Sequence, residues 1–218
     1  MSTFTYSYPN THVAGSPENV SSEWAKTFTS GFGGAGVGLS LLSMVLLIVW
    51  LTSEEGGGLG ARSPDGVTAE YFNWHPLLMS AAFLVFMAPA SSAFEVYSPL
   101  SRATNKRVHA ALQTVAVILL ACGYAIIYDC HVGLSDTGLA NSMHSIAGYM
   151  TMAMVGLAYA MGFVLYVLGY GGELRGTLKP LHKRLGMFSL MMGYDYYDTY
   201  GFNILRNIHV NDYIRAYT

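Results

Sequence analysis

Four histidines are spaced almost evenly along the chain, and imidazole is the commonest side-chain ligand of metals in proteins. They are separated by 34, 35 and 38 residues, and each stands at the start of an apolar segment: His75, His109, His144 and His182. If these segments cross a membrane, consecutive ones run in opposite directions. Histidines at successive segment starts then alternate between the two faces of the bilayer. The spacing therefore predicts two pairs, His75 with His144 and His109 with His182.

The composition indicates that membrane helices position these histidines. Of the 218 residues, 52% are hydrophobic and only 11% are charged, whereas a soluble domain carries about 25% charged residues. Four segments of at least 20 residues contain no Lys, Arg, Asp or Glu: 31–52, 74–93, 108–128 and 143–168. A helix of roughly 20 apolar residues is long enough to cross the hydrocarbon core. We therefore predict an all-α membrane protein, a transmembrane helix bundle that encloses both histidine pairs.

The basic residues collect in alternate connections between these segments. Segments 94–107 and 169–184 hold seven of the eleven Lys and Arg residues, whereas 53–73 and 129–142 are acidic. The positive-inside rule places the basic connections in the cytosol, and the N-terminus with them. We expect a multi-pass integral membrane protein with His109 near the cytosolic face. The net charge of −2 gives no basis for a nucleic-acid partner.

A pair of imidazoles suits haem iron better than zinc. Zinc takes four protein ligands in a structural site, or three with an open position, and no Cys, Asp or Glu lies beside these histidines in the sequence. Haem needs two axial ligands, and two imidazoles leave no open position, which favours electron transfer. Gly148, one turn after His144, would let a flat macrocycle approach the backbone. A metal or proton transporter is an alternative, but the apolar segments contain no carboxylate.

Five short motifs resemble those of the eukaryotic cytochrome b561 family in order and spacing. They are FNWHPL (72–77), KRVH (106–109), YDCH (128–131), NSMHS (141–145) and KPLH (179–182). The resemblance runs from about residue 31 to about residue 193. It implies a six-helix oxidoreductase with two b haems in its four central helices, held by the same histidine pairs. Such proteins carry electrons from cytosolic ascorbate to monodehydroascorbate or a ferric chelate across the membrane.

The resemblance also implies two substrate sites, one at each face, and no separate catalytic side chain. The cytosolic ascorbate site would use Lys106, Arg102, Arg175 and Lys179. Ascorbate is an anion, so basic side chains would attract and orient it. The acceptor site on the other face would use His131 and Asn141. Alternatively, Arg175 and Lys179 only set the topology, and His131 is a solvated loop residue.

The C-terminal part departs from the family pattern. A fifth helix begins in the sequence, but Asp195, Tyr196, Tyr197 and Asp198 follow only about a dozen apolar residues, so we expect it to be partial and too short to span. The expected organisation is a flexible cytosolic tail at 1–30, the bundle at 31–193 and a polar tail at 194–218. Because His182 lies on the shortened helix, a non-catalytic or single-haem membrane subunit is the alternative function.

Two glycines in the first apolar segment suggest close helix packing. Gly34 and Gly38 have the small-xxx-small spacing that lets helices approach closely. We expect them to pack against helices of the same chain, and a homodimer is the alternative. The membrane itself, whether endomembrane, vacuolar or plasma membrane, is not specified by the sequence.

Overall fold

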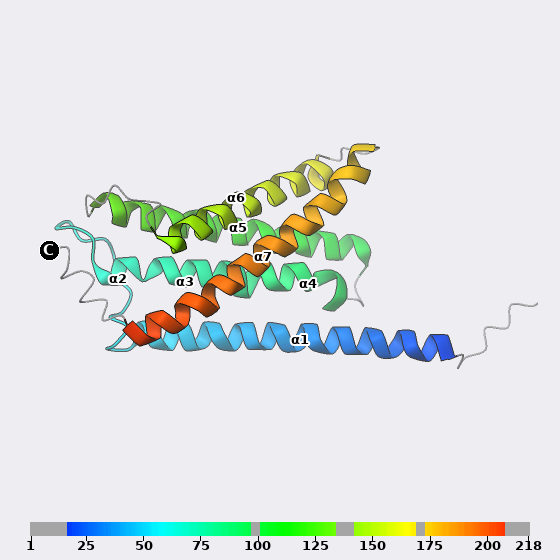
Figure 1. Ribbon diagram of the computed structural model, residues 1–218, viewed down its shortest axis with the longest axis horizontal. Coiled ribbons are helices and arrows are strands. Elements are labelled where there is room, and N and C mark those ends of the chain that lie inside the picture. The colour runs from blue at the N-terminus through cyan, green and yellow to red at the C-terminus, as the bar shows by residue number, and fades with distance from the viewer. Residues whose placement is uncertain (1–16, 97–100, 134–141, 169–172, 208–218) are drawn as a thin grey trace, which may run out of the picture.

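The computed structural model describes residues 17–96, 101–133, 142–168 and 173–207. These residues form helices and one isolated β-bridge, between Ser63 and Gly66. In chain order the elements are α1 (Pro17–Thr52), α2 (Ala69–Phe72), α3 (Trp74–Ser80), the π-helix η1 (Ala81–Met87), α4 (Ala88–Val96), α5 (Arg102–Gly133), α6 (Met143–Gly162), the π-helix η2 (Phe163–Val167) and α7 (Glu173–Asn207). The predicted all-α fold is confirmed (Figure 1).

Four helical segments are long and apolar enough to cross a membrane, and they match the four predicted spans. They cover Gly33–Thr52, Ala69–Phe94, Arg102–Val132 and Met143–Tyr166. Their outward side chains are apolar: on α1, Leu39 is 64% exposed and Leu46 is 60% exposed. A soluble helix would present polar side chains at such positions, whereas lipid tails solvate apolar ones. The chain is therefore a multi-pass membrane protein.

Two of the spans contain a wide helical turn. The N–H of Ala88 donates to the carbonyl of Phe83, five residues back instead of four. Pro89 follows directly, and a wider turn relieves the clash between a proline ring and the preceding turn. At the end of the fourth span, the N–H of Leu168 donates to the carbonyl of Phe163 at 3.1 Å. Each wide turn changes the direction in which the following side chains point.

The spans pack side by side, and α7 crosses them obliquely (Figure 1). The second span, from α3 to α4, contacts α1 on one side and α5 on the other, and α7 contacts α6, η1 and α4. A Cβ at Gly193 would lie 2.6 Å from the Phe83 ring, so this glycine lets α7 approach η1. The buried core comes from the middle of three spans and comprises Ala82, Phe83, Met87, Ala116, Leu120 and Val155.

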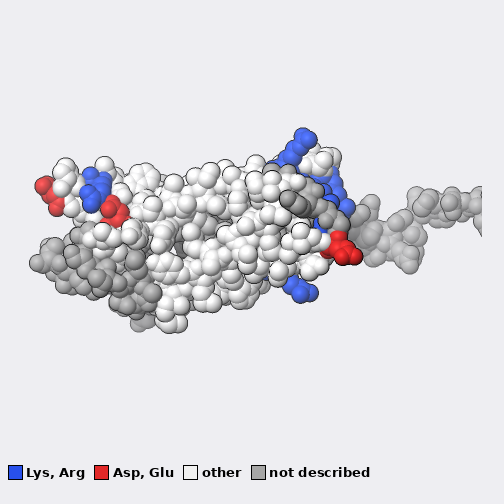
Figure 2. Space-filling model, turned by 90° about the horizontal axis from the view of Figure 1, so that it is seen from above, with Lys and Arg blue, Asp and Glu red and all other residues white. Residues whose placement is uncertain are grey.

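Charged side chains gather at the two ends of the bundle, with an uncharged band between them (Figure 2). One end, called the basic end here, holds the start of α5 and the start of α7, with Arg102, Lys106, Arg107, Arg175, Lys179, Lys183 and Arg184. The other, the acidic end, holds the loop between α1 and α2 and the end of α5. The only ion pair among the described residues lies there, between Arg62 Nε and Asp129 Oδ2 at 2.7 Å.

Two helix boundaries differ from those expected from the sequence. α7 continues unbroken to Asn207, so the backbone does not leave the helix at residues 195–198. Asp and Tyr keep ordinary helix propensities, so they oppose burial in lipid without interrupting the hydrogen-bonded backbone. Among the described residues, α7 is nevertheless not one of the helices that are long and apolar enough to be a candidate membrane span. α1 begins at Pro17, inside the expected tail, and proline is favoured in the first helical turn.

The expected packing of Gly34 and Gly38 within the chain is not seen. Both lie on exposed positions of α1, and a Cβ added to either would meet nothing within 4 Å. The second span contacts α1 through α4, η1 and α3, and Ser40 of α1 is buried. The division of the chain at residues 30 and 193 stays a prediction.

Candidate functional site

The structure brings the four histidines together as two facing pairs. The ring centroids of His75 on α3 and His144 on α6 are 6.2 Å apart, with 65° between the ring planes. Those of His109 on α5 and His182 on α7 are also 6.2 Å apart, with 76° between the planes. His75 and His144 begin their helices near the acidic end, whereas His109 and His182 lie near the basic end. This is the spatial pairing that helix alternation predicts.

The separation within each pair fits one metal ion held between two imidazoles. An imidazole nitrogen lies about 1.2 Å from its ring centroid and binds a transition metal at about 2.0 Å, so two ligands on opposite sides place their centroids about 6.4 Å apart. The observed 6.2 Å agrees with this value at both pairs. A metal ion between the two imidazoles would account for this distance without direct contact between the rings.

The helices that carry each pair leave room between them. Across the described residues, no Cα of α3 comes within 8 Å of a Cα of α6, and the same holds for α5 and α7. Beside the ligands, a Cβ at Gly148 or at Gly186 would meet nothing within 4 Å. Gly148 follows His144 by one turn, and Gly186 follows His182 by one turn. A flat macrocycle therefore has open space against both helix backbones.

Backbone carbonyls fix the tautomer of three of the four imidazoles. Nδ1 lies 2.9 Å from the Gly123 carbonyl for His75, 2.7 Å from the Ala90 carbonyl for His109 and 2.8 Å from the Ala158 carbonyl for His182. A carbonyl can only accept, so Nδ1 carries the proton and donates it. Nε2 then carries the lone pair that can bind a metal, as in protein sites where a second partner orients a metal ligand.

Gly162 sets the position of the His182 ring. A Cβ at residue 162 would lie 3.0 Å from Cε1 and 3.5 Å from Nδ1 of His182. Any larger side chain would push the imidazole away from the Ala158 carbonyl. The close approach of α6 and α7 at the basic end thus depends on this glycine.

The start of α3 is held by a clamp formed from the FNWHPL motif. The buried Asn73 side chain donates from Nδ2 to the carbonyls of Gly56 and Gly58, at 2.7 and 2.8 Å. The next residue, Trp74, donates from Nε1 to the carbonyl of Gly60 at 2.9 Å. These bonds fasten the loop after α1 to the turn that begins α3. His75 follows immediately, so the clamp positions a candidate ligand.

At the basic end, two predicted substrate residues converge on one tyrosine. Lys106 Nζ lies 5.6 Å from the centre of the Tyr166 ring, and Arg175 Cζ lies 5.5 Å from it. The Tyr166 and His182 ring centroids are 6.2 Å apart. A cation over an aromatic face is held by the ring quadrupole. Lys106, Arg175 and Tyr166 therefore form a basic cluster next to a histidine pair.

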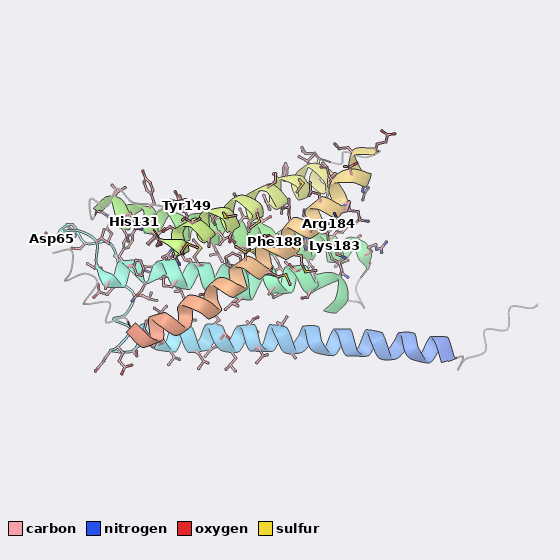
Figure 3. All side chains as sticks on the ribbon, viewed as in Figure 1. Asp65, His131, Tyr149, Lys183, Arg184 and Phe188 are labelled. Atoms are coloured by element: carbon pink, nitrogen blue, oxygen red, sulfur yellow. The ribbon has the colours of Figure 1, made fainter. Side chains whose placement is uncertain are left out.

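The other predicted substrate residues lie at the expected ends. Arg102 begins α5 and Lys179 is on α7, both exposed at the basic end and without a described contact to Tyr166. His131 lies in the last turn of α5 at the acidic end (Figure 3). His75 and His144 lie at the same end of the bundle. Asn141 lies outside the described residues.

Several residues of the site were not identified from the sequence. Tyr166, Gly162 and Asn73 act through contacts between segments that are distant in the chain, and nothing local distinguishes them from packing residues. The motif around His75 contained Asn73 without showing its role. No group of three or more His, Cys, Asp or Glu side chains that could hold a metal occurs in the part of the chain that is described. A zinc-type ligand set is thus not found there.

Comparison with known proteins identifies the family. The sequence profile described as eukaryotic cytochrome b561 matches residues 74–201. The chain is 28% identical over 153 residues to a probable ascorbate-specific transmembrane electron transporter of Oryza sativa subsp. japonica, covering 69% of this chain and 62% of that protein. It is 32% identical over 154 residues to a lysosomal membrane ascorbate-dependent ferrireductase of Homo sapiens, covering 67% and 60%.

A third relative is a plasma membrane ascorbate-dependent reductase of Xenopus laevis, 28% identical over 153 residues, or 69% of this chain and 52% of that protein. The chain thus spans about three fifths or less of the length of these curated relatives. The matched segment contains all four paired histidines, the whole of α3, α5 and α6, and α7 as far as residue 201. The chain belongs to the eukaryotic cytochrome b561 family, whose members bind haem b.

Proposed function

We propose that this protein is an ascorbate-dependent oxidoreductase that moves electrons across a membrane, using two haems b per chain. The observation that supports this most strongly is the presence of two histidine pairs near opposite ends of one bundle, each with ring centroids 6.2 Å apart. Each pair fits one haem, and together they provide a site near each face. Relatives named as ascorbate-specific electron transporters and ascorbate-dependent reductases support the same reaction class.

When bound, haem b supplies a one-electron couple. The chain's own residues fix the conditions for it: His75 and His144 form one ligand pair, and His109 and His182 form the other. The Nδ1–H bonds of His75, His109 and His182 to backbone carbonyls keep these three rings oriented. Two imidazole ligands would leave no open position for small molecules, which favours electron transfer over oxygen chemistry.

We assign the ascorbate site to the basic cluster of Lys106, Arg175 and Tyr166, with Arg102 and Lys179 adding positive charge at the same end. Ascorbate is a monoanion at neutral pH, so these side chains raise its local concentration and orient its enediol. The Tyr166 ring lies against His182, so an anion held by the two cations would sit close to the ligand pair. The cytosolic side of the membrane, with the N-terminus, is assigned to this end by the positive-inside rule.

The acceptor, either monodehydroascorbate or a ferric chelate, is assigned to the acidic end. His131 lies there, at the same end as the His75–His144 pair, and it can accept a proton or bind iron. Asn141 is proposed as its companion on the basis of the family motif. The names of the relatives include lysosomal and plasma membranes, so an endomembrane, vacuolar or plasma membrane is proposed for this chain too.

The function is tested with purified protein in vesicles loaded with ascorbate. Ferric citrate and a colorimetric ferrous chelator are added outside, and absorbance reports electron transfer. Wild-type vesicles should reduce external iron, whereas protein-free vesicles and vesicles with His144→Ala should not. Reduction no faster than in protein-free vesicles would contradict the proposal. A reduced-minus-oxidised spectrum with one haem component instead of two would favour the single-haem subunit.

A homodimer through α1 is the remaining partner proposed. Gly34 and Gly38 lie on an exposed face where a Cβ meets nothing within 4 Å, so a second α1 has room to approach closely. Cysteine cross-linking at residue 35 in native membranes tests this contact. A monomer band alone would contradict it.

A further inference from the structure

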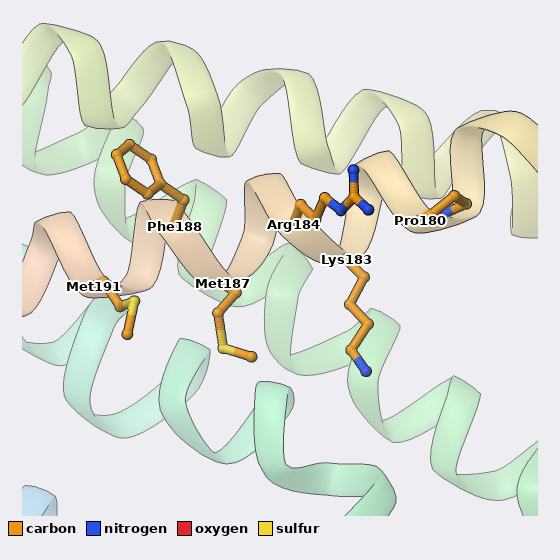
Figure 4. Close-up of a pocket in the computed structure, with 6 residues that line it drawn as sticks. All are labelled: Pro180, Lys183, Arg184, Met187, Phe188 and Met191. Atoms are coloured by element: carbon orange, nitrogen blue, oxygen red, sulfur yellow. The ribbon is translucent and has the colours of Figure 1, made fainter.

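The outer face of α7 carries an open groove that the proposed electron transfer does not use. The groove has a volume of about 430 Å³ and is lined by Pro180, Lys183, Arg184, Met187, Phe188 and Met191. These positions recur at intervals of three and four residues, so they form one stripe along the helix. Figure 4 shows Lys183, Met187 and Met191 on one side of the stripe, and Arg184 and Phe188 on the other.

The two cations of the groove have no acidic partner in the described part of the chain. The single ion pair found there joins Arg62 to Asp129 at the acidic end. Glu173 is the only acidic residue between positions 137 and 194, and it lies ten residues before Lys183, roughly 15 Å along the helix. Lys183 and Arg184 are both exposed. Two adjacent cations without a described ion-pair partner, at a membrane surface, attract an anion.

Below these cations the groove is apolar. Met187, Phe188 and Met191 are 54%, 53% and 59% exposed. Lys183 and Met191 are eight residues apart, or about 12 Å along the axis of the oblique α7, which fits within the hydrocarbon thickness of one leaflet, about 15 Å. The cations therefore lie at the level of the lipid headgroups when the apolar side chains lie among the acyl chains.

We propose that this groove binds one anionic diacyl phospholipid from the leaflet at the basic end. Its phosphate lies between Lys183 and Arg184, one acyl chain follows Met187 and Met191, and the other follows Phe188. A second copy of the chain is a poorer occupant, because a symmetric contact would bring two sets of the same cations together. His182 lies on the same turn of α7, so the lipid would brace the helix that carries a histidine of the basic-end pair.

The proposal is tested by native mass spectrometry of protein taken from bilayers. The protein is reconstituted in equal amounts of phosphatidylglycerol and phosphatidylcholine with identical acyl chains, then released into mild detergent. Wild type should retain one phosphatidylglycerol in preference to phosphatidylcholine. Each basic residue near an anionic lipid changes its binding about fivefold, so Lys183→Gln with Arg184→Gln should lower retention about 25-fold.

Two matched variants keep the result interpretable. Arg107→Gln removes an exposed cation from the same end but outside the groove, and it should retain the lipid as wild type does. Lys183→Arg with Arg184→Lys preserves both charges and should also retain it, which separates loss of charge from a damaged helix. Equal retention by the double Gln variant, equal loss in Arg107→Gln, no preference over phosphatidylcholine, or a protein dimer in place of the lipid adduct would each overturn the proposal.

Discussion

Replacing Gly162 with valine should selectively weaken the histidine pair at the basic end. A Cβ at residue 162 would lie 3.0 Å from His182 Cε1, whereas carbon atoms in contact normally stay about 3.5–4.0 Å apart. The ring must therefore move by roughly 0.5–1 Å for the Cβ alone, and further for the two methyl groups of valine. The bond from His182 Nδ1 to the Ala158 carbonyl, 2.8 Å long, would then approach the length at which it is lost.

Loss of a partner that orients a metal ligand typically lowers metal affinity about 10–100-fold. Gly162→Val should lose one haem component in a reduced-minus-oxidised spectrum, and the pyridine haemochrome assay should show less haem per chain. Gly156→Val is the matched control, because it makes the same change on the same helix where a Cβ would meet nothing within 4 Å. If Gly162→Val keeps both components at the amplitude of Gly156→Val, the assigned role of Gly162 is wrong.

Three further predictions concern the substrate site and the acidic end. Lys106→Gln should raise the KM for ascorbate about tenfold and make the KM less dependent on salt concentration, because a cation of the cluster is lost. Arg107→Gln is the control, and an unchanged KM in Lys106→Gln would place ascorbate elsewhere. Tyr166→Leu should raise the same KM roughly threefold, since both cation–π contacts disappear. Tyr166→Phe keeps the ring, so its KM should stay within twofold of the wild-type value. Equal KM values in the two variants would show that the aromatic ring is not responsible. Asn73→Ala should destabilise the protein by about 2 kcal/mol in thermal unfolding, because two hydrogen bonds of a buried side chain are removed. Arg62→Ala should cost less than about 1 kcal/mol, because its ion pair is partly exposed. A larger loss of stability in Arg62→Ala than in Asn73→Ala would contradict the proposed clamp.

The membrane spans and the histidine pairing could be predicted from the sequence because both follow from simple periodicities. Apolar length fixes the spans, and alternation of helix direction then places His75 opposite His144 without knowledge of any contact. The charge asymmetry of the connections similarly predicts the basic end that the structure shows (Figure 2). These predictions remain the same if the boundary of each predicted span is wrong by a few residues.

The finer features depend on contacts between distant segments. Tyr166 becomes part of the basic cluster only because α7 brings Arg175 to it. The carbonyls that orient the imidazoles belong to residues of ordinary type, such as Ala90 and Ala158. The break expected at residues 195–198 was wrong, because charged residues limit burial in lipid, whereas helix formation depends on backbone hydrogen bonds. Gly34 was misassigned because its spacing cannot specify which helix lies opposite.

The pairing of the histidines is tested most directly by four single alanine variants and their reduced-minus-oxidised spectra. His75→Ala and His144→Ala should each remove the same haem component, and His109→Ala and His182→Ala should each remove the other. The 6.2 Å separation within both pairs predicts this two-by-two pattern. Loss of different components from His75→Ala and His144→Ala, or retention of both components in all four variants, would contradict the proposed haem sites.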